Sequence, residues 1–168
     1  MRFLVLAVRF VPFFVTAAPA CSSSSSANMC KVYDPPSDFV ATTPAVSFKT
    51  DVAPIFQKSC AFSSCHGNEN GGNQANLYLG DDKAKIFTNL VGFTATKYPQ
   101  MPRIAANDAK NSYLMHKIDG DSCTLPSCSG ACANTMPDDT AIDQSPSLLT
   151  VAQRDTFRRW ILQGAQNN

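Results

Sequence analysis

Cys60-Ala-Phe-Ser-Ser-Cys65-His66 is the stretch of this 168-residue chain that decides most about its fold. It places two thiols on one short loop, and an imidazole directly follows the second thiol. A haem attached through its vinyl groups requires two such thiols and an imidazole that can bind the iron, usually spelled Cys-x-x-Cys-His. The spacer here has four residues instead of two. The loop therefore predicts covalent haem binding through a variant of the usual motif.

Two other interpretations of the same residues stay open. Cys60 and Cys65 can instead form a small structural disulfide, as is common in exported domains. Zinc would need four ligands, and the only other histidine, His116, lacks the spacing of a zinc finger. His66 favours haem, because it stands at the one position where haem chemistry requires an imidazole.

The residues around the loop resemble a known family. Residues 48–56 read Phe-Lys-Thr-Asp-Val-Ala-Pro-Ile-Phe, and Gly67 follows the histidine. This stretch resembles the c-type cytochromes attached to many bacterial envelope proteins, in which a Phe-x-x-Asp-Val-x-Pro-Ile helix runs into the haem loop. The resemblance covers residues 47–165. It implies an all-α, cytochrome c-like fold of class I type, with roughly three to five helices and long loops around one haem c.

The resemblance also implies a role for each site residue. Cys60 and Cys65 would attach the haem, and His66 would be the proximal iron ligand. A Met-Pro in the loop before the last helix supplies the distal thioether in that family, which points to Met136. A thioether raises the reduction potential relative to a second imidazole. Met101, which also precedes a proline, His116 and an open sixth position are the alternatives.

Apolar spacing and capping residues predict the helices. The first is expected over 52–59 with Asp51 as its cap, and the second from Asp81 or Asp82 to Leu90. A third is expected over 108–118, closed by Gly120. Few segments alternate in the manner of strands. The sequence therefore predicts an all-α domain.

The last helix has the clearest signals. Thr150 with Gln153 three positions later fits a capping box, and Gly164 marks the end. Its expected buried positions are Phe157, Trp160 and Ile161. Its three arginines, at positions 154, 158 and 159, are expected in solvent.

The N-terminus carries the features of an export signal. Two arginines, an apolar run and small residues before a cleavage point predict a signal peptide over residues 1–20. Cys21, followed by five serines, stands where a lipoprotein cysteine would stand; the alternative is a simple cleaved signal. Residues 21–46 are expected to be a lipidated flexible linker, and residues 47–168 the cytochrome c-like domain.

The seven cysteines are compatible with both haem and non-haem interpretations. Lipidation and two thioethers leave four cysteines, at positions 30, 123, 128 and 132, which suffice for two disulfides. Without haem, six cysteines remain for three bridges. Both interpretations leave an even number of cysteines, so the count does not distinguish between them. The sequence selects no connectivity, but the three later cysteines are expected to staple the Met136 loop, with Cys30 as the partner of the odd one.

Charge and motifs together limit the function classes. The net charge is only +1, and the sequence contains no cluster of basic residues that would favour nucleic acid binding. The expected function is one-electron transfer rather than enzymatic catalysis, with redox partner proteins in the envelope. The expected location is the periplasmic or cell-surface side of a bacterial membrane. The alternatives are a non-haem, disulfide-stapled envelope lipoprotein with a binding or structural role, and a peroxidase-like haem protein with an open sixth site.

Overall fold

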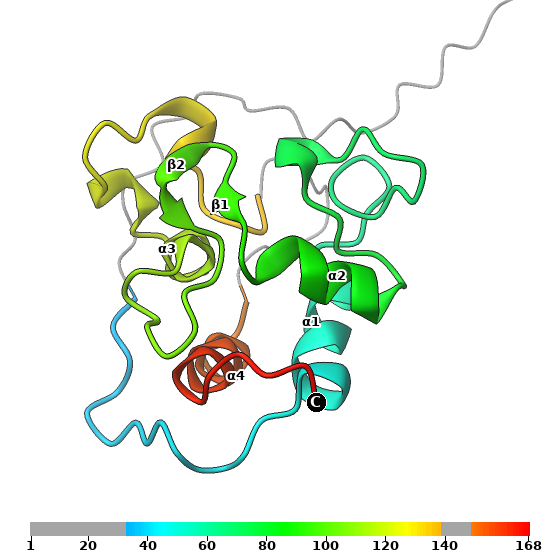
Figure 1. The fold of residues 1–168 in the computed structure, drawn as a ribbon. Helices are drawn as coiled ribbons and strands as arrows, with labels where there is room; N and C mark the ends of the chain where they lie inside the picture. Colours follow the sequence, from blue (N-terminus) through cyan, green and yellow to red (C-terminus); the bar gives the residue numbers. More distant parts are fainter. Residues whose placement is uncertain (1–32, 139–148) are drawn as a thin grey trace, which may run out of the picture.

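The computed structural model describes residues 33–138 and 149–168. Within them the fold is rich in helix and includes a small antiparallel sheet (Figure 1). The expectation of a purely α-helical domain was therefore too strict. In chain order the elements are η1 (Phe48–Val52), α1 (Ala53–Ser59), η2 (Gln74–Asn76), α2 (Lys83–Leu90), β1 (Thr94–Ala95), β2 (Tyr98–Pro102), α3 (Tyr113–Asp119), η3 (Ser122–Thr124), η4 (Gly130–Cys132) and α4 (Val151–Leu162).

The first helical segment starts earlier than predicted. A π-helical turn, η1, begins at Phe48 and runs directly into α1. Ser47 is its N-cap, and the Oδ2 atom of Asp51 accepts a hydrogen bond from the backbone N–H of Ser47 at 2.7 Å. Asp51 therefore acts from inside the first turn and reaches back to the cap, as an acidic residue in a capping box does.

The second helix begins and ends where the sequence indicates. The Oδ1 atom of Asp82 accepts from the backbone N–H of Lys85 at 3.0 Å and caps α2. The third helix is shorter than predicted, because the Asp108 carboxylate accepts from the backbone N–H of Asn111 at 3.1 Å and closes a turn there. Helix α3 then ends at Gly120, whose φ of 81° lies in the left-handed region that favours glycine.

The hairpin of β1 and β2 was not predicted. Thr94 pairs with Pro102 and Ala95 with Tyr98, and the register shifts between the two pairs. Strand β1 has only two residues and β2 contains two prolines, so neither leaves a clear period-two pattern in the sequence, which explains why the prediction was all-α. The chain that leaves β2 runs past α3.

Helix α4 packs against both η1 and α3 (Figure 1). Its capping box is formed as predicted: the side chains of Thr150 and Gln153 each accept from the other's backbone N–H. The ring centroids of Phe56 and Phe157 are 4.7 Å apart, and both side chains are fully buried. Burying side chains of this size stabilises the fold by about 2–3 kcal/mol each. This contact joins the N-terminal and C-terminal helices of the domain.

Arg158 contradicts the expectation that all three α4 arginines are in solvent. Its side chain is buried and forms ion pairs with Asp119 at 2.5 Å and with Asp155 at 3.3 Å. Two carboxylates, from the end of α3 and from α4 itself, offset the loss of water around the guanidinium.

Part of the expected linker packs on α4. The backbone N–H of Tyr33 donates to the carbonyl of Asp119 at 3.1 Å, and its hydroxyl donates to Asp155 at 3.3 Å. The guanidinium of Arg159 lies 4.8 Å from the ring centroid of Phe39. Residues 33–46 therefore lie against the domain. The expected signal peptide, Cys21 and Cys30 lie outside the described residues.

Candidate functional site

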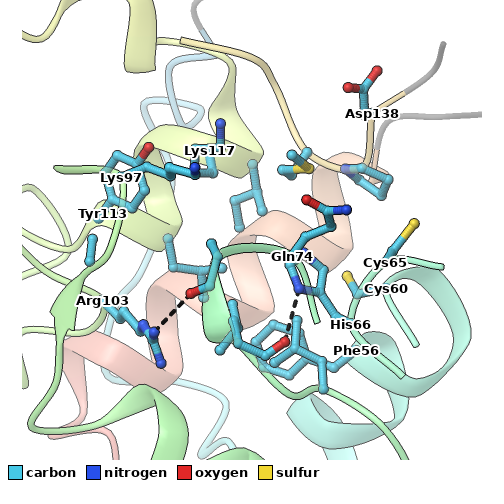
Figure 2. A pocket seen from close by; sticks show the side chains of 18 of the residues that line it. Phe56, Cys60, Cys65, His66, Gln74, Lys97, Arg103, Tyr113, Lys117 and Asp138 are labelled. Carbon is cyan, nitrogen blue, oxygen red and sulfur yellow. Dashed lines mark hydrogen bonds between the residues drawn. The ribbon is translucent and has the colours of Figure 1, made fainter. Parts of the chain in front are cut away.

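A cavity of about 260 Å³ opens between the loop after α1, the hairpin, α3 and the segment before α4 (Figure 2). This volume is just below the range of about 300–1,000 Å³ typical of small-molecule sites, and far above what one ion needs. All four residues that the sequence nominates for cofactor binding line it: Cys60, Cys65, His66 and Met136. Two segments that are distant in the sequence thus meet at one pocket.

The two alternative iron ligands are placed elsewhere. Met101 does not line the pocket and packs against the cluster around Tyr98 and Tyr113. His116 lies 2.8 Å from Asp121 Oδ1 through its Nδ1 atom and 2.9 Å from the Lys110 carbonyl through its Nε2 atom. Both partners only accept hydrogen bonds, so both nitrogens carry protons when both bonds form. His116 then has no lone pair for a metal.

The imidazole of His66 is held in one orientation. Its Nδ1 atom lies 2.9 Å from the carbonyl oxygen of Leu77. A carbonyl only accepts, so Nδ1 carries the proton and Nε2 keeps the lone pair. Burial lowers the pKa of His66, although hydrogen bonds to the backbone of Leu77 and Gln74 act in the opposite direction. The ring is therefore neutral at neutral pH, which is the form that binds metals.

The loop that carries His66 is tightly folded around one carbonyl. The carbonyl oxygen of Phe62 accepts from the backbone N–H groups of Cys65, His66 and Gly67, at 2.9, 3.1 and 3.0 Å. A Cβ atom at Gly67 would lie 2.1 Å from the carbonyl oxygen of Ala61, so only glycine fits there. The longer Cys-x4-Cys spacer thus forms a compact turn.

The two cysteines of the pocket differ in oxidation state. Cys60 is a free thiol, and burial raises its pKa to about 12. The sulfur of Cys65 is engaged in a disulfide. The Cys60–Cys65 bridge that the non-haem interpretation expected is thus not formed. Covalent haem attachment would require Cys65 to be a reduced thiol instead of part of a disulfide.

One side of the pocket is cationic. Figure 2 shows Lys97, Arg103 and Lys117 on the side away from Cys60 and Cys65. Arg103 is 9% exposed, and Lys117, 8% exposed, has its pKa lowered by burial to about 8. Within residues 33–138 and 149–168 neither forms an ion pair.

Both buried cations bond to backbone carbonyls instead. Arg103 donates to the carbonyls of Asn89 at 2.6 Å and Ala75 at 3.2 Å. Among the described residues, Asp138 supplies the one carboxylate in the lining. The positive charge of this side favours a ligand that carries carboxylates.

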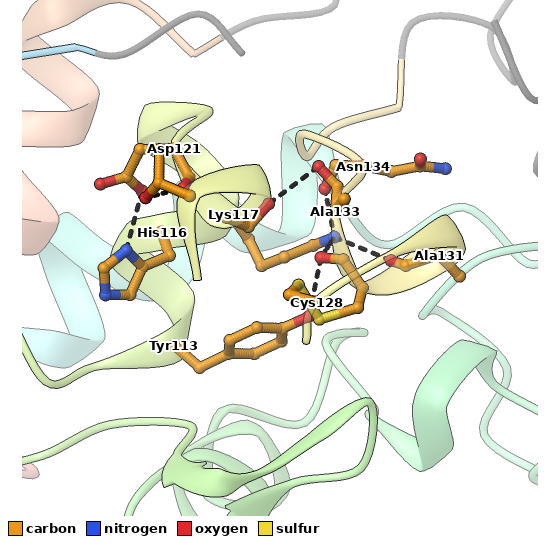
Figure 3. Close-up of a disulfide and its surroundings, with 11 residues drawn as sticks. Tyr113, His116, Lys117, Asp121, Cys128, Ala131, Ala133 and Asn134 are labelled. Carbon is orange, nitrogen blue, oxygen red and sulfur yellow. Dashed lines mark hydrogen bonds and ion pairs between the residues drawn. A yellow bond between two sulfur atoms is a disulfide. The ribbon is translucent and has the colours of Figure 1, made fainter. Parts of the chain in front are cut away.

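The segment that ends in Met136 is stapled by a disulfide, as the sequence led us to expect (Figure 3). Cys128 and Cys132 are bonded, with a Cα–Cα distance of 5.3 Å. Cys123 is also disulfide-bonded. The expected pairing of Cys30 with one of the loop cysteines lies outside the described residues.

Sequence reasoning missed Arg103, Lys117 and the Leu77 carbonyl. One signal was present for Lys117: it follows Leu114 by three residues, so the two share a helix face, and both line the pocket. Arg103 follows a Met-Pro pair and gave no local signal. A carbonyl contact has no signature in side-chain patterns.

Two features are absent from the described residues. These residues contain no group of three or more His, Cys, Asp or Glu side chains that could hold a metal ion, so the zinc alternative gains no support. Nor does any helix there reach the length and apolarity needed to cross a membrane.

Comparison with models of known protein families, with curated proteins and with solved structures finds no match to this chain.

Proposed function

We propose that this chain is a cytochrome c-like envelope protein that binds one haem c and transfers single electrons. One observation carries the proposal: Cys60, Cys65, His66 and Met136, nominated from the sequence alone, all line the same pocket. A loop with two cysteines and one histidine, and a methionine from a separate loop, form the donor set of a thioether-bound haem with an axial thioether sulfur.

Each residue has a distinct role in this proposal. Cys60 and Cys65 would attach the haem, His66 would offer its Nε2 atom to the iron, and Met136 would offer its thioether sulfur. When bound, the haem supplies a one-electron couple between ferric and ferrous iron. The chain holds it, shields it from water and sets its potential through ligand type and burial. The proposal assigns no enzymatic reaction to the chain.

The charge of the pocket supports the same ligand. A haem carries its vinyl groups and its propionates on opposite edges. If Cys60 and Cys65 held the vinyl edge, the positive charge of Lys97, Arg103 and Lys117 on the other side of the pocket would favour the propionate carboxylates (Figure 2). Positive groups in a partly buried site favour carboxylates.

The disulfide state of Cys65 favours a second candidate. A disulfide-stapled envelope module without haem would keep the same helices and use the pocket for a non-covalent ligand or for no ligand. In that case Cys60 is a half-buried thiol with a packing role, in keeping with its raised pKa.

The test is to produce the full chain in a host that matures c-type cytochromes, and to stain a denaturing gel for haem peroxidase activity. We expect a stained band at the size of the mature chain. Replacing both cysteines, Cys60→Ala with Cys65→Ala, should abolish the band. A colourless wild-type protein that folds and is exported would overturn the proposal in favour of the second candidate.

The location is part of the proposal and has its own test. A signal peptide over residues 1–20 and lipidation of Cys21 would place the domain on the outer side of a bacterial membrane, near redox partner proteins. The mature protein should partition into detergent and begin at a modified Cys21. Recovery of a soluble form with a free N-terminus would refute lipidation.

A further inference from the structure

The Met136 segment, residues 131–136, has little apolar anchorage of its own. Its one buried side chain is Cys132, which is 6% exposed. A segment with few buried apolar contacts opens easily unless other bonds hold it. The Cys128–Cys132 disulfide ties only Cys132 to the preceding turn, so residues 133–136 depend on hydrogen bonds. The contacts of this segment with the α3 region therefore determine where the sulfur of Met136 lies.

Lys117 supplies four of these contacts (Figure 3). Its Nζ atom donates to the carbonyl oxygens of Ala131 at 3.0 Å and Cys132 at 3.1 Å, and also to that of Asn134. Its own carbonyl oxygen accepts from the backbone N–H of Met136 at 2.8 Å. An ammonium group has three N–H donors, so the three carbonyls use all of them.

The ammonium group and the carbonyls depend on each other. Lys117 is 8% exposed and is in none of the ion pairs of the described residues. Burial lowers its pKa, and the charge of Asp138, in the same pocket lining, acts on it from farther away and partly opposes this lowering. A buried charge without a counter-ion is stable only where dipoles surround it. Loss of the ammonium would leave three carbonyls without their shared donor, and the segment would lose its main restraint. Two neutral groups contribute one bond each: Tyr113 to Cys132 and Ser122 to Ala133.

We propose that Lys117 is the positioning residue for Met136: by holding three carbonyls of the segment, it fixes the thioether sulfur in the pocket that His66 lines. This inference rests on the proposed function, because the sulfur acts only on a bound iron. Lys117 itself is no iron ligand here, since its three protons are engaged and its nitrogen has no free lone pair.

The test compares variants of the haem-loaded full chain. Lys117→Met keeps the length of the side chain and removes every donor. We expect loss of the weak charge-transfer band that marks Met–iron ligation, and binding of added imidazole at least about tenfold tighter than in the wild type. Lys117→Arg restores donors and should recover part of the band. Lys117→Gln keeps two donors and serves if Lys117→Met does not fold.

The matched control is His116→Gln, on the same helix but bonded to Asp121 and Lys110 rather than to the segment. It should keep the band and the imidazole affinity of the wild type. A folded Lys117→Met or Lys117→Gln protein with a wild-type band and affinity overturns the inference, as does an equal loss in His116→Gln. A wild-type chain that carries no haem overturns the proposed function instead, so the two failures are distinguishable.

Discussion

Nδ1 of His66 lies 2.9 Å from the carbonyl oxygen of Leu77. This contact selects the tautomer that leaves Nε2 as the basic nitrogen, and it fixes the plane of the ring. The backbone of His66 is held as well, because its carbonyl accepts from the N–H of Leu79 at 2.7 Å. The histidine is thus oriented by the chain itself, as an axial ligand requires.

The first prediction concerns the distal ligand. In the haem-loaded protein, Met136→Ala should abolish the Met–iron charge-transfer band and lower the reduction potential, because a thioether stabilises ferrous iron. Added imidazole should bind at least about tenfold tighter, since it no longer displaces the sulfur. Absorption spectroscopy and redox titration measure these effects.

Met101→Ala is the matched control, because Met101 is also followed by proline but lies outside the pocket lining. It should leave band and potential unchanged. If Met101→Ala lost the band and Met136→Ala kept it, the ligand assignment would have to be reversed.

The second prediction concerns the haem loop. Gly67→Ala should lower the free energy of unfolding by about 3 kcal/mol, because the added Cβ lies 2.1 Å from the Ala61 carbonyl oxygen and the loop must move. Gly92→Ala, at a φ of +85° with no atom within 4 Å, should cost about 1 kcal/mol. Urea denaturation measures both, and an equal or smaller loss for Gly67→Ala would contradict the loop geometry.

The third prediction concerns the buried ion pairs. Arg158→Met should lower the free energy of unfolding by about 3–5 kcal/mol, because it leaves Asp119 and Asp155 buried without their cation. Arg159→Met, one residue along α4, should cost no more than about 1 kcal/mol. Similar losses for the two variants in urea denaturation would show that Arg158 is not the buried partner.

Local signals in the sequence predicted the helix ends well. The Thr150–Gln153 capping box, the cap at Asp82 and the left-handed Gly120 depend on neighbouring residues alone, so a single sequence contains the information. The start of α3 was misplaced because Asp108 caps a turn instead of a helix. The same residue types serve both purposes.

The charged groups of the interior were not predictable in this way. Arg158 is buried because Asp119, on another helix, lies 2.5 Å away, and Lys117 is buried because three carbonyls of a distant loop surround it. Both depend on tertiary contacts that leave no local pattern. The candidate site residues, by contrast, were found from spacing and resemblance, and the structure brings all four to one pocket.

The fourth prediction concerns pH. The hydrogen bond to Asp121 is the main cause that raises the pKa of His116, burial opposes it, and the nearby charge of Asp119 adds to the rise. A raised folded-state pKa stabilises the fold below the unfolded-state pKa of about 6.5, and this stabilisation is lost as pH rises through the folded-state value.

His116→Gln should therefore lower the free energy of unfolding more at pH 5.5 than at pH 8.5, by about 1 kcal/mol or less because the pair is partly exposed. Urea denaturation at the two pH values provides the comparison. A larger loss at pH 8.5 would contradict the ion pair with Asp121.

The most direct test of the central claim is the intact mass of the mature chain after full reduction and alkylation under denaturing conditions. Thioether bonds survive reduction, whereas disulfides do not. The account predicts one haem per chain, with Cys60 and Cys65 both unalkylated. A chain without haem, in which Cys60 and Cys65 are both alkylated, would show that neither sulfur carries a thioether and would contradict the account.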